Sequence, residues 1–204
     1  MTAAPDGKIL YESSGSRANV ISGQVFALDP NSGDARSVAR GLKGGYAHIF
    51  DGEGNLWLTE IADGAIGGET LPGEINFVSS ERYTTGERAN FGWPTCFGRE
   101  QQGPNCEETE PAVTILPLNS TPTGIAVSPF AESELLVPLW VTGEVVRISY
   151  RLTENGSAIG EPLPFVEGMS NPQHIITHPN QDGKLVVWLS DYATGQIYQI
   201  DDGG

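Results

Sequence analysis

Apolar residues recur along the chain in short alternating runs separated by turn residues. The clearest example comprises residues 172–179, 184–191 and 195–201, with Asn, Asp and Gly in the turn after the first run. Alternation with a period of two predicts β-strands that bury one face, and the turn residues predict tight connections. The last part of the chain is therefore expected to form three consecutive antiparallel strands.

The same order of strand, turn, strand, glycine and strand occurs in three earlier segments. These segments are residues 5–39, 46–78 and 122–150. The first begins at the turn before its second strand, so we expect the innermost strand of that repeat to be absent. In the second, an insertion at residues 61–73 separates the second strand from the third.

A repeat of about 45 to 50 residues, stretched to roughly 80 in the second copy, is typical of four-stranded propeller blades. The prediction is an all-β fold, a β-propeller of four-stranded antiparallel blades. About four blades are expected in a single domain, at residues 1–44, 45–118, 119–168 and 169–204. A β-sandwich is the alternative fold.

A row of blades must close, because each sheet packs face to face on its neighbours. Four blades, of which the first lacks an inner strand and the last lacks an outer strand, do not close a ring. We expect that the chain is the C-terminal part of a six-bladed ring with missing N-terminal blades, or that it closes its ring as a homo-oligomer.

Composition and charge narrow the class of partner. The 204 residues include 26 Gly and 14 Pro, which suits a chain rich in turns, and the formal net charge is −15. Such a charge repels phosphate backbones and anionic lipid, so neither nucleic acid nor a membrane surface is expected as a partner. No apolar run approaches the roughly 20 residues of a membrane span, and residues 1–6 lack the features of a signal peptide.

Cys96 and Cys106 flank a loop rich in Gly and polar residues, with no further thiol or nearby His to complete a zinc site. We expect a disulfide that closes this loop. A disulfide favours a periplasmic or extracellular location, with the signal peptide outside this chain.

The positions that can carry chemistry follow from the propeller prediction. Innermost strands line the central channel, and the loops entering them build the ligand site. His48 and His174 occupy equivalent places early in two such strands and are weak catalytic candidates; a structural role is the alternative. Residues 51–55 have oxygen side chains at alternate positions, but a hairpin turn explains them better.

The insertion at residues 61–73 is a candidate metal loop. Glu60, Asp63, Glu69 and Glu74 accompany several glycines there, and oxygen ligands of this kind suit calcium. An acidic surface loop is the alternative. The sequence has no nucleophile elbow and no phosphate-binding glycine loop, so if the protein is an enzyme, a bound cofactor or metal must carry the chemistry.

The segment from Arg88 to Gly98, with residues 74–76 ahead of it, reads E-I-N and then N-F-G-W-P-T-C-F-G. This pattern resembles the soluble glucose/sorbosone dehydrogenases, which are quinoprotein β-propellers. Weaker similarities at residues 39–42, 56–60 and 135–148 extend the resemblance over nearly the whole chain. It implies oxidation of an aldose with pyrroloquinoline quinone (PQQ) and calcium, by a His base in an early blade that these residues do not include.

The resemblance also assigns cofactor positions, several of which differ from the family pattern. An Arg-Asn pair of the family falls on Lys43 and Gly44, a His falls on Asn119, and a basic pair falls on Val141 and Thr142. The quinone has three carboxylates, and each lost charge-assisted hydrogen bond removes roughly 1.5–3 kcal/mol of binding. These changes predict a divergent or non-catalytic relative.

The calcium loop of the family corresponds to residues 60–63. By resemblance, the backbone carbonyls of Ala62 and Asp63 would approach calcium, and together with Glu60 and Glu74 of the acidic insertion they are the predicted metal ligands.

Three functions remain open at this point. The first is a sugar-dehydrogenase-like propeller that uses PQQ and calcium. The second is a non-catalytic secreted propeller that binds a sugar, another small molecule or a protein through its loops. The third is a streptogramin-lyase-like propeller that uses His48 and His174 at the channel mouth.

Overall fold

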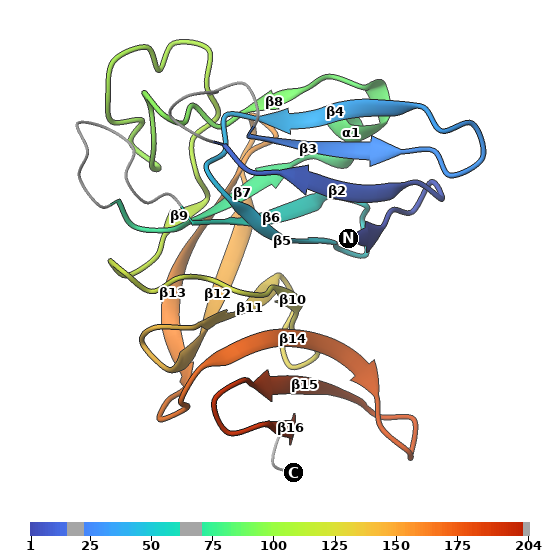
Figure 1. The fold of residues 1–204 in the computed structure, drawn as a ribbon, viewed down its shortest axis with the longest axis vertical. Coiled ribbons are helices and arrows are strands. Elements are labelled where there is room, and N and C mark those ends of the chain that lie inside the picture. Colours follow the sequence, from blue (N-terminus) through green and yellow to red (C-terminus); the bar gives the residue numbers. More distant parts are fainter. Residues whose placement is uncertain (16–22, 62–70, 202–204) are drawn as a thin grey trace.

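Alternating strands and tight turns build four sheets in a computed structural model that describes residues 1–15, 23–61 and 71–201. Figure 1 shows the first sheet at the top, the fourth at the bottom and the other two between them. In chain order the elements are β1 Thr2–Ala3, β2 Ile9–Ser13, β3 Gln24–Leu28, β4 Ala35–Arg40, β5 Gly45–Phe50, β6 Leu56–Glu60, β7 Glu74–Val78, α1 Ser80–Thr85, β8 Ala89–Asn90, β9 Thr114–Ile115, β10 Ala126–Val127, β11 Glu134–Leu139, β12 Glu144–Leu152, β13 Ala158–Val166, β14 Pro172–Pro179, β15 Leu185–Asp191 and β16 Gln196–Ile200.

The sheets follow the repeats of the sequence. Their strand orders are β1-β2-β3-β4-β8, β5-β6-β7-β9, β10-β11-β12-β13 and β14-β15-β16. All neighbouring strands pair antiparallel except β4 and β8, which are parallel. The predicted all-β class and four-sheet propeller architecture are confirmed, and the fourth sheet has three strands, as expected.

The expectation that the first sheet lacks its innermost strand is wrong. Thr2 and Ala3 form β1 and pair with Leu10 and Ile9 of β2. The strand has only two residues, too few for an alternating pattern to be visible in the sequence.

The core is divided among the three interfaces between successive sheets. The first interface packs Leu10 and Val25 against Leu56, Leu58 and Val78. The second packs Trp57 and Phe77 of the second sheet against residues of the third, and the last packs Leu136 of the third sheet against Val187 and Leu189 of the fourth. Face-to-face packing of this kind is typical of propeller blades.

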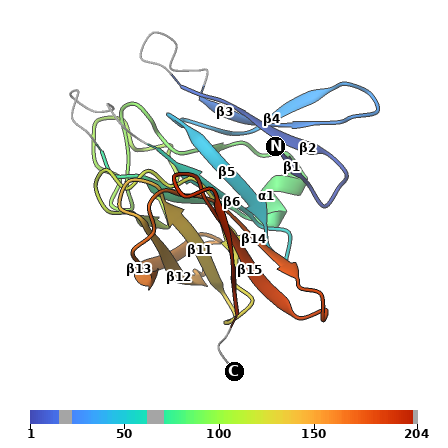
Figure 2. The same cartoon turned by 60° about the horizontal axis from the view of Figure 1, so that its bottom comes forward.

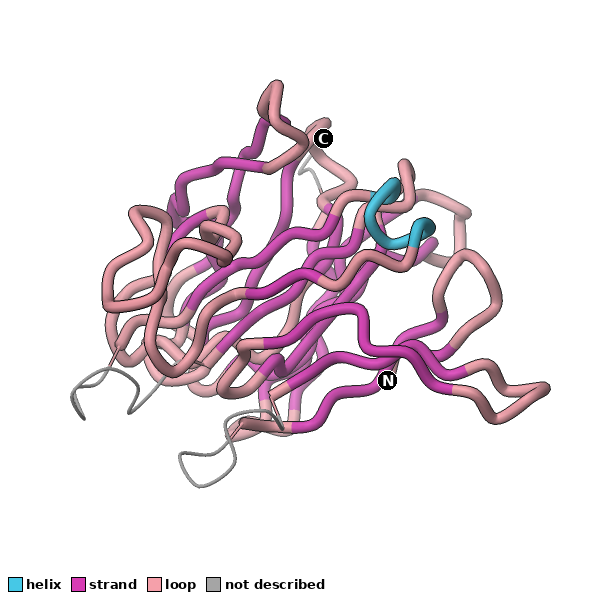
Figure 3. Tube along the Cα trace, turned by 90° about the horizontal axis from the view of Figure 1, so that it is seen from above, coloured by secondary structure: helices cyan, strands magenta, loops and turns pink. Residues whose placement is uncertain are grey.

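The row of sheets is open. No strand pairing joins the first sheet to the fourth in the part of the chain that the structure describes. Figure 2 shows β5 and β6 between the first sheet and β14–β15, and Figure 3 shows strands through the middle of the molecule with loops at their ends. The architecture is that of a partial propeller.

One helix occurs among the described residues, and its six residues are far fewer than a bilayer crossing requires. It begins after Ser79, whose Oγ accepts a hydrogen bond from the amide of Arg82, and ends at Gly86 with φ of 81°. Serine at the N-cap and glycine in the left-handed conformation at the C-terminus are favourable helix boundaries.

Candidate functional site

The loops expected to form the site gather at one end of the sheets, which we call the loop end. Strand β5 begins beside the end of β6, because Gly45 is the register partner of Glu60. A Cβ atom on Gly73 would lie 2.8 Å from the carbonyl oxygen of Glu60 and 3.0 Å from Pro122, so the second and third sheets meet there. The side chain of Asn171 donates a hydrogen bond to the carbonyl of Trp140, which joins the fourth sheet to the third at this end.

Two buried glutamates lie side by side at the loop end of the second sheet. Glu60 and Glu74 are register partners across β6 and β7 and are 1% and 2% exposed. Glu60 accepts hydrogen bonds from the amide of Lys43 at 2.6 Å and from the Asn76 side chain at 3.1 Å. Glu74 accepts one from the amide of Gly98. The two carboxyl groups are therefore held by hydrogen-bond donors from three different segments of the chain.

Burial raises the pKa of both carboxyl groups. The pKa of Glu74 rises to about 7 through desolvation. The pKa of Glu60 lies well above its usual range because of desolvation and the neighbouring Glu74 charge, although the Lys43 amide opposes this rise. Two buried carboxylates at close range cannot both ionise freely, so the pair retains a proton near neutral pH unless a cation replaces it.

Asn76 adds an oxygen without a partner to this cluster. Its side chain is fully buried, and its Nδ2 donates to Glu60. Its Oδ1 accepts no hydrogen bond from the described part of the chain. A buried carbonyl oxygen without a donor is costly, and a bound cation or an ordered water would relieve that cost.

The predicted cofactor positions are distributed around the same end. Lys43 and Gly44 precede β5 beside Glu60, and the carbonyl of Gly44 accepts a hydrogen bond from Ile61. Asn119 and Thr142 lie in two loops joined by a hydrogen bond from the amide of Val141 to the carbonyl of Ser120. The loop end thus holds all four positions, in two groups.

Ala62, Asp63 and Glu69 lie outside the described residues. Among the residues that are described, no group of three or more His, Cys, Asp or Glu side chains is placed to hold a metal. The remaining metal candidates, Glu60 and Glu74, form a pair.

The innermost strands enclose a separate cavity of about 690 Å³. His48 from β5 and His174 from β14 both line it, together with Tyr46 and Ile125. The structure thus brings the two histidines to one cavity in the channel, where their equivalent strand positions predicted them.

His48 is neutral at physiological pH. It is 5% exposed, and burial lowers its pKa to about 4. The hydroxyl of Thr2 donates to the carbonyl of His48 at 2.8 Å and also lies 2.7 Å from Nδ1. A hydroxyl has one proton to donate, so Nδ1 is the protonated nitrogen and Nε2 is the basic one. His174 is exposed, and its amide donates to Ser190.

The N-F-G-W-P segment is a structural element of the first sheet rather than a lining of the channel. The amides of Phe91 and Trp93 donate to the carbonyls of Arg40 and Gly41, each at 2.9 Å, and so extend the parallel pairing of β4 and β8. Phe91 is 3% exposed and packs into the first core interface. The Cys96–Cys106 disulfide follows, as predicted, and closes the next loop.

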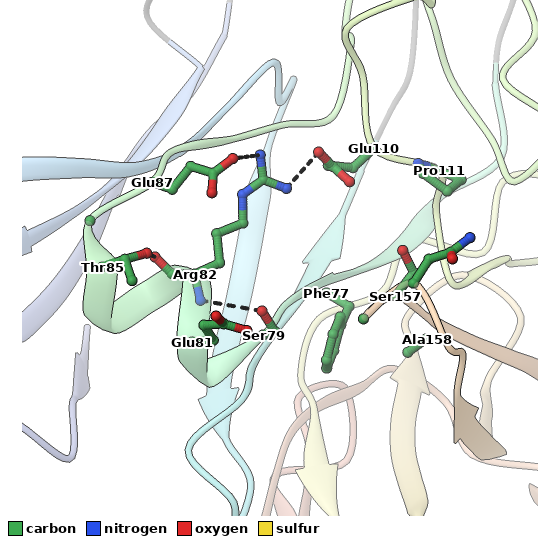
Figure 4. Close-up of a pocket in the computed structure, with 13 residues that line it drawn as sticks. Phe77, Ser79, Glu81, Arg82, Thr85, Glu87, Glu110, Pro111, Ser157 and Ala158 are labelled. Carbon is green, nitrogen blue, oxygen red and sulfur yellow. Dashed lines mark hydrogen bonds and ion pairs between the residues drawn. The ribbon is translucent and has the colours of Figure 1, made fainter.

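Sequence reasoning missed a crevice of about 600 Å³ between α1 and the β12–β13 turn. Figure 4 shows the guanidinium of Arg82 between Glu87 and Glu110, with Ser157 and Ala158 on the β12–β13 side of the crevice. Arg82 donates to Glu110 at 2.5 Å and lies 3.2 Å from Glu87. The N-cap Ser79 and the stop at Gly86 are the signals that could have revealed this helix. The one arginine of the lining is already paired with two glutamates, so it is not available to bind an anionic ligand.

No protein-family model and no curated protein sequence matches the chain. Similarity appears among solved structures. The PQQ-bound form of aldose sugar dehydrogenase from Streptomyces coelicolor is 17% identical, with a TM-score of 0.67 over 99% of this chain and 57% of that one. The holo form of the PQQ domain of pyranose dehydrogenase from Coprinopsis cinerea is 12% identical, with a TM-score of 0.65 over 94% of this chain and 69% of that one.

Proteins with other descriptions share the fold. An auxiliary nutrient binding protein from Bacteroides ovatus is 12% identical, with a TM-score of 0.61 over 100% of this chain and 44% of that one. The chain spans just over half the length of the Streptomyces protein. In fold, therefore, the chain resembles part of the PQQ-dependent sugar dehydrogenases, within a wider set of similar structures.

Proposed function

We propose that this chain is part of a sugar-dehydrogenase-like propeller that oxidises an aldose with PQQ and calcium. The observation that carries the proposal is the buried cluster of Glu60, Glu74 and Asn76 at the loop end, beside Lys43. The structural likeness to PQQ-bound sugar dehydrogenases supports it. The disulfide supports a periplasmic or extracellular location.

The residues of the cluster fit calcium. Their donors are oxygens, which hard cations prefer, and Asn76 Oδ1 lacks a partner in the described structure. A divalent ion would replace the proton held by Glu60 and Glu74 and stabilise both carboxylates. We propose these three residues as ligands, with the carbonyls of Ala62 and Asp63 from the adjoining loop.

The residues fit the quinone less completely. Lys43 would bind one carboxylate of PQQ as a point charge, while Asn119 and Thr142 would donate hydrogen bonds, with Gly44 leaving room for close approach. When bound, the quinone would accept hydride from the sugar. One cation for three carboxylates predicts an affinity lower than a site with bidentate arginines would give.

The first test is calorimetric titration of PQQ into the calcium-loaded protein, with the solution mass measured by light scattering on the same sample. We expect binding near micromolar Kd, and about tenfold weaker binding for Lys43→Gln, as loss of one charge-assisted contact predicts. Lys184→Gln, in the β14–β15 turn, is the matched control. Failure to bind PQQ, or equal affinity of both variants, would contradict the assignment.

Calcium binding is tested separately. We expect calcium to raise the melting temperature of the wild-type protein and to have little effect on Glu74→Gln, because that variant lacks one charged ligand. An equal rise in both proteins would place calcium elsewhere.

The channel cavity favours a second candidate, a propeller that binds a small ligand without chemistry. Its lining combines apolar side chains with His48 and His174, and pockets of this size commonly bind small molecules. Turnover of an aldose with PQQ would support the first candidate over the second.

A third candidate is a lyase that uses His48 and His174 as general base and acid. If this candidate is correct, replacing both histidines with Gln must abolish turnover.

A further inference from the structure

A cavity of about 420 Å³ lies outside the channel, where β4 runs beside β8 and meets the disulfide loop. Arg40 comes from β4, Arg88 immediately precedes β8, and Trp93 and Thr95 come from the segment that follows. Asn105 reaches it from the disulfide loop. Gln24 of β3 also lines the cavity, which is therefore built by four segments that the fold brings together.

The charge of this cavity is opposite to that of the molecule. The chain carries a formal net charge of −15, yet the described residues lining the cavity include two arginines and no Asp or Glu. Neither guanidinium forms an ion pair or hydrogen bond with the described part of the chain, in contrast to Arg82 and Arg99, which bind glutamates. Two guanidiniums without partners at one cavity present donors that suit an oxyanion.

The walls of the cavity are firmly held. The carbonyls of Arg40 and Gly41 accept backbone hydrogen bonds from Phe91 and Trp93. Gly41 has φ of 72°, and a Cβ atom there would lie 2.5 Å from the amide nitrogen of Gly92, so the two segments cross at a distance that only glycine allows. A site with fixed walls loses little entropy when a ligand binds.

Neutral groups complete the lining. Trp93 is 4% exposed, and its Nε1 donates to no acceptor in the described structure. Thr95 and Asn105 add a hydroxyl and an amide. Cavities of a few hundred cubic ångströms accommodate small molecules, and hydroxyl, amide and indole groups are suited to the hydroxyls of a sugar.

We propose that this cavity binds the oxyanion of a sugar-sized ligand, either the carboxylate of a sugar acid or the phosphate of a sugar phosphate, between Arg40 and Arg88. The proposal is independent of PQQ and calcium, since none of the residues involved belongs to the loop-end cluster or the channel.

The test is calorimetric titration of the full chain with D-glucuronate, D-glucose 6-phosphate and D-glucose, without quinone. We expect the two anionic sugars to bind and D-glucose to bind at least about tenfold more weakly, with binding of the anions declining as salt rises. Arg40→Gln and Arg88→Gln should each weaken anion binding about tenfold, as loss of a charge-assisted hydrogen bond predicts. Arg151→Gln, on β12 of the third sheet, removes the same charge elsewhere and should leave the affinity within about twofold.

Arg→Lys variants at positions 40 and 88 test the geometry, because lysine keeps the charge and loses the planar pair of donors. An intermediate affinity supports the proposal. Absence of anion binding, equal affinity for D-glucose and D-glucuronate, or an equal loss in Arg151→Gln would overturn it. If a variant fails to fold, the wild-type preference for anionic over neutral sugar decides. The stronger of the two anions identifies the source of the oxyanion as carboxylate or phosphate.

Discussion

The strand register of β6 and β7 places the carboxyl groups of Glu60 and Glu74 next to each other. Because they are partners across β6 and β7, the antiparallel pairing places their side chains on the same face of the sheet, and both are buried. Such a pair does not stabilise the fold when both carboxyl groups are ionised, since like charges at paired positions repel. The cluster therefore makes the protein sensitive to protons and to cations.

The two raised pKa values predict a stability that falls with rising pH. The folded state holds protons on Glu60 and Glu74 at pH values where the unfolded carboxyls, near 4.5, have lost them. Their stabilisation is complete below pH 4.5 and is lost as pH rises through the raised pKa values, of which that of Glu74 is about 7. We expect the calcium-free free energy of unfolding of wild type, relative to Glu74→Gln, to fall by roughly 2–3 kcal/mol between about pH 5 and 8.

Urea unfolding in EDTA across this pH range measures the difference. Glu132→Gln, which removes an exposed carboxylate, is the control and should follow wild type. His48 has a lowered pKa and opposes the slope below about pH 6.5, but it contributes equally to all three proteins and cancels in the difference. A parallel pH dependence of wild type and Glu74→Gln would show that the pair carries no extra proton.

At the scale of elements, the segment after α1 joins the first two sheets. It leaves β7, pairs in parallel with β4 through β8, and returns as β9 to the edge of β7. Its close crossings depend on glycine. Gly92 has φ of 88°, and a Cβ atom there would lie 2.7 Å from Cβ of Cys96.

Gly92→Ala is expected to destabilise the protein by roughly 2–5 kcal/mol, from left-handed backbone strain together with overpacking. Gly86→Ala is the matched control, because Gly86 also has a positive φ, of 81°, but a Cβ atom there would have no neighbouring atom within 4 Å. It should cost only about 1 kcal/mol, the backbone contribution alone. Thermal and urea unfolding measure both, and equal losses would mean that the steric contact is relieved without cost.

The disulfide closes a sequence separation of 10 residues. Removing it with Cys106→Ser, which leaves the buried Cys96 in place, should cost roughly 2–3 kcal/mol of unfolding free energy. Wild-type protein in reductant should lose the same amount, and Cys106→Ser should be insensitive to reductant. A reductant effect on the variant would point to a cause other than this bond.

Sequence pattern predicted the elements that repeat and missed those that do not. Strands β14 and β15 alternate over long runs and were predicted nearly to the residue, and the Asp51–Asn55 segment forms the expected turn, in which Asp51 accepts from the amides of Glu53 and Asn55. Two-residue strands such as β1 and β8 give no periodic signal.

The residues of the sites were predicted only in part. Glu74 was predicted as a ligand from composition, whereas the unpaired oxygen of Asn76 is visible only in three dimensions. Arg40 and Arg88, 48 positions apart, meet only through the parallel pairing.

At the scale of the whole molecule, the end of the row formed by the fourth sheet exposes apolar side chains. On the fourth sheet Ile197 is 72% and Ile176 43% exposed. Strand β16 also has no partner on its outer edge among the described strands. Exposed apolar surface and unpaired strand edges favour association.

We therefore expect the isolated 21.8 kDa chain to associate with itself in solution. Ile197→Lys should return the mass measured by light scattering to that of a monomer, because a charge would then have to be buried in the contact. Leu118→Lys, which alters a residue 57% exposed in a loop, is the control and should leave the mass unchanged. A monomeric wild-type chain at high concentration would contradict this expectation.

Because β8 pairs with β4, the first sheet cannot be completed until β8 has been synthesised. While the ribosome is still adding the residues of β5 to β7, the outer edge of β4 is unpaired, because its partners Ala89 and Asn90 have not yet been synthesised. The outer edge of β7 is likewise unpaired until Thr114 and Ile115 of β9 have been added. During translation, neither of the first two sheets therefore has all of its strands paired before the segment up to β9 has been added. We expect the first two sheets to emerge as one cooperative folding unit, with the third and fourth sheets added to a surface that is already complete.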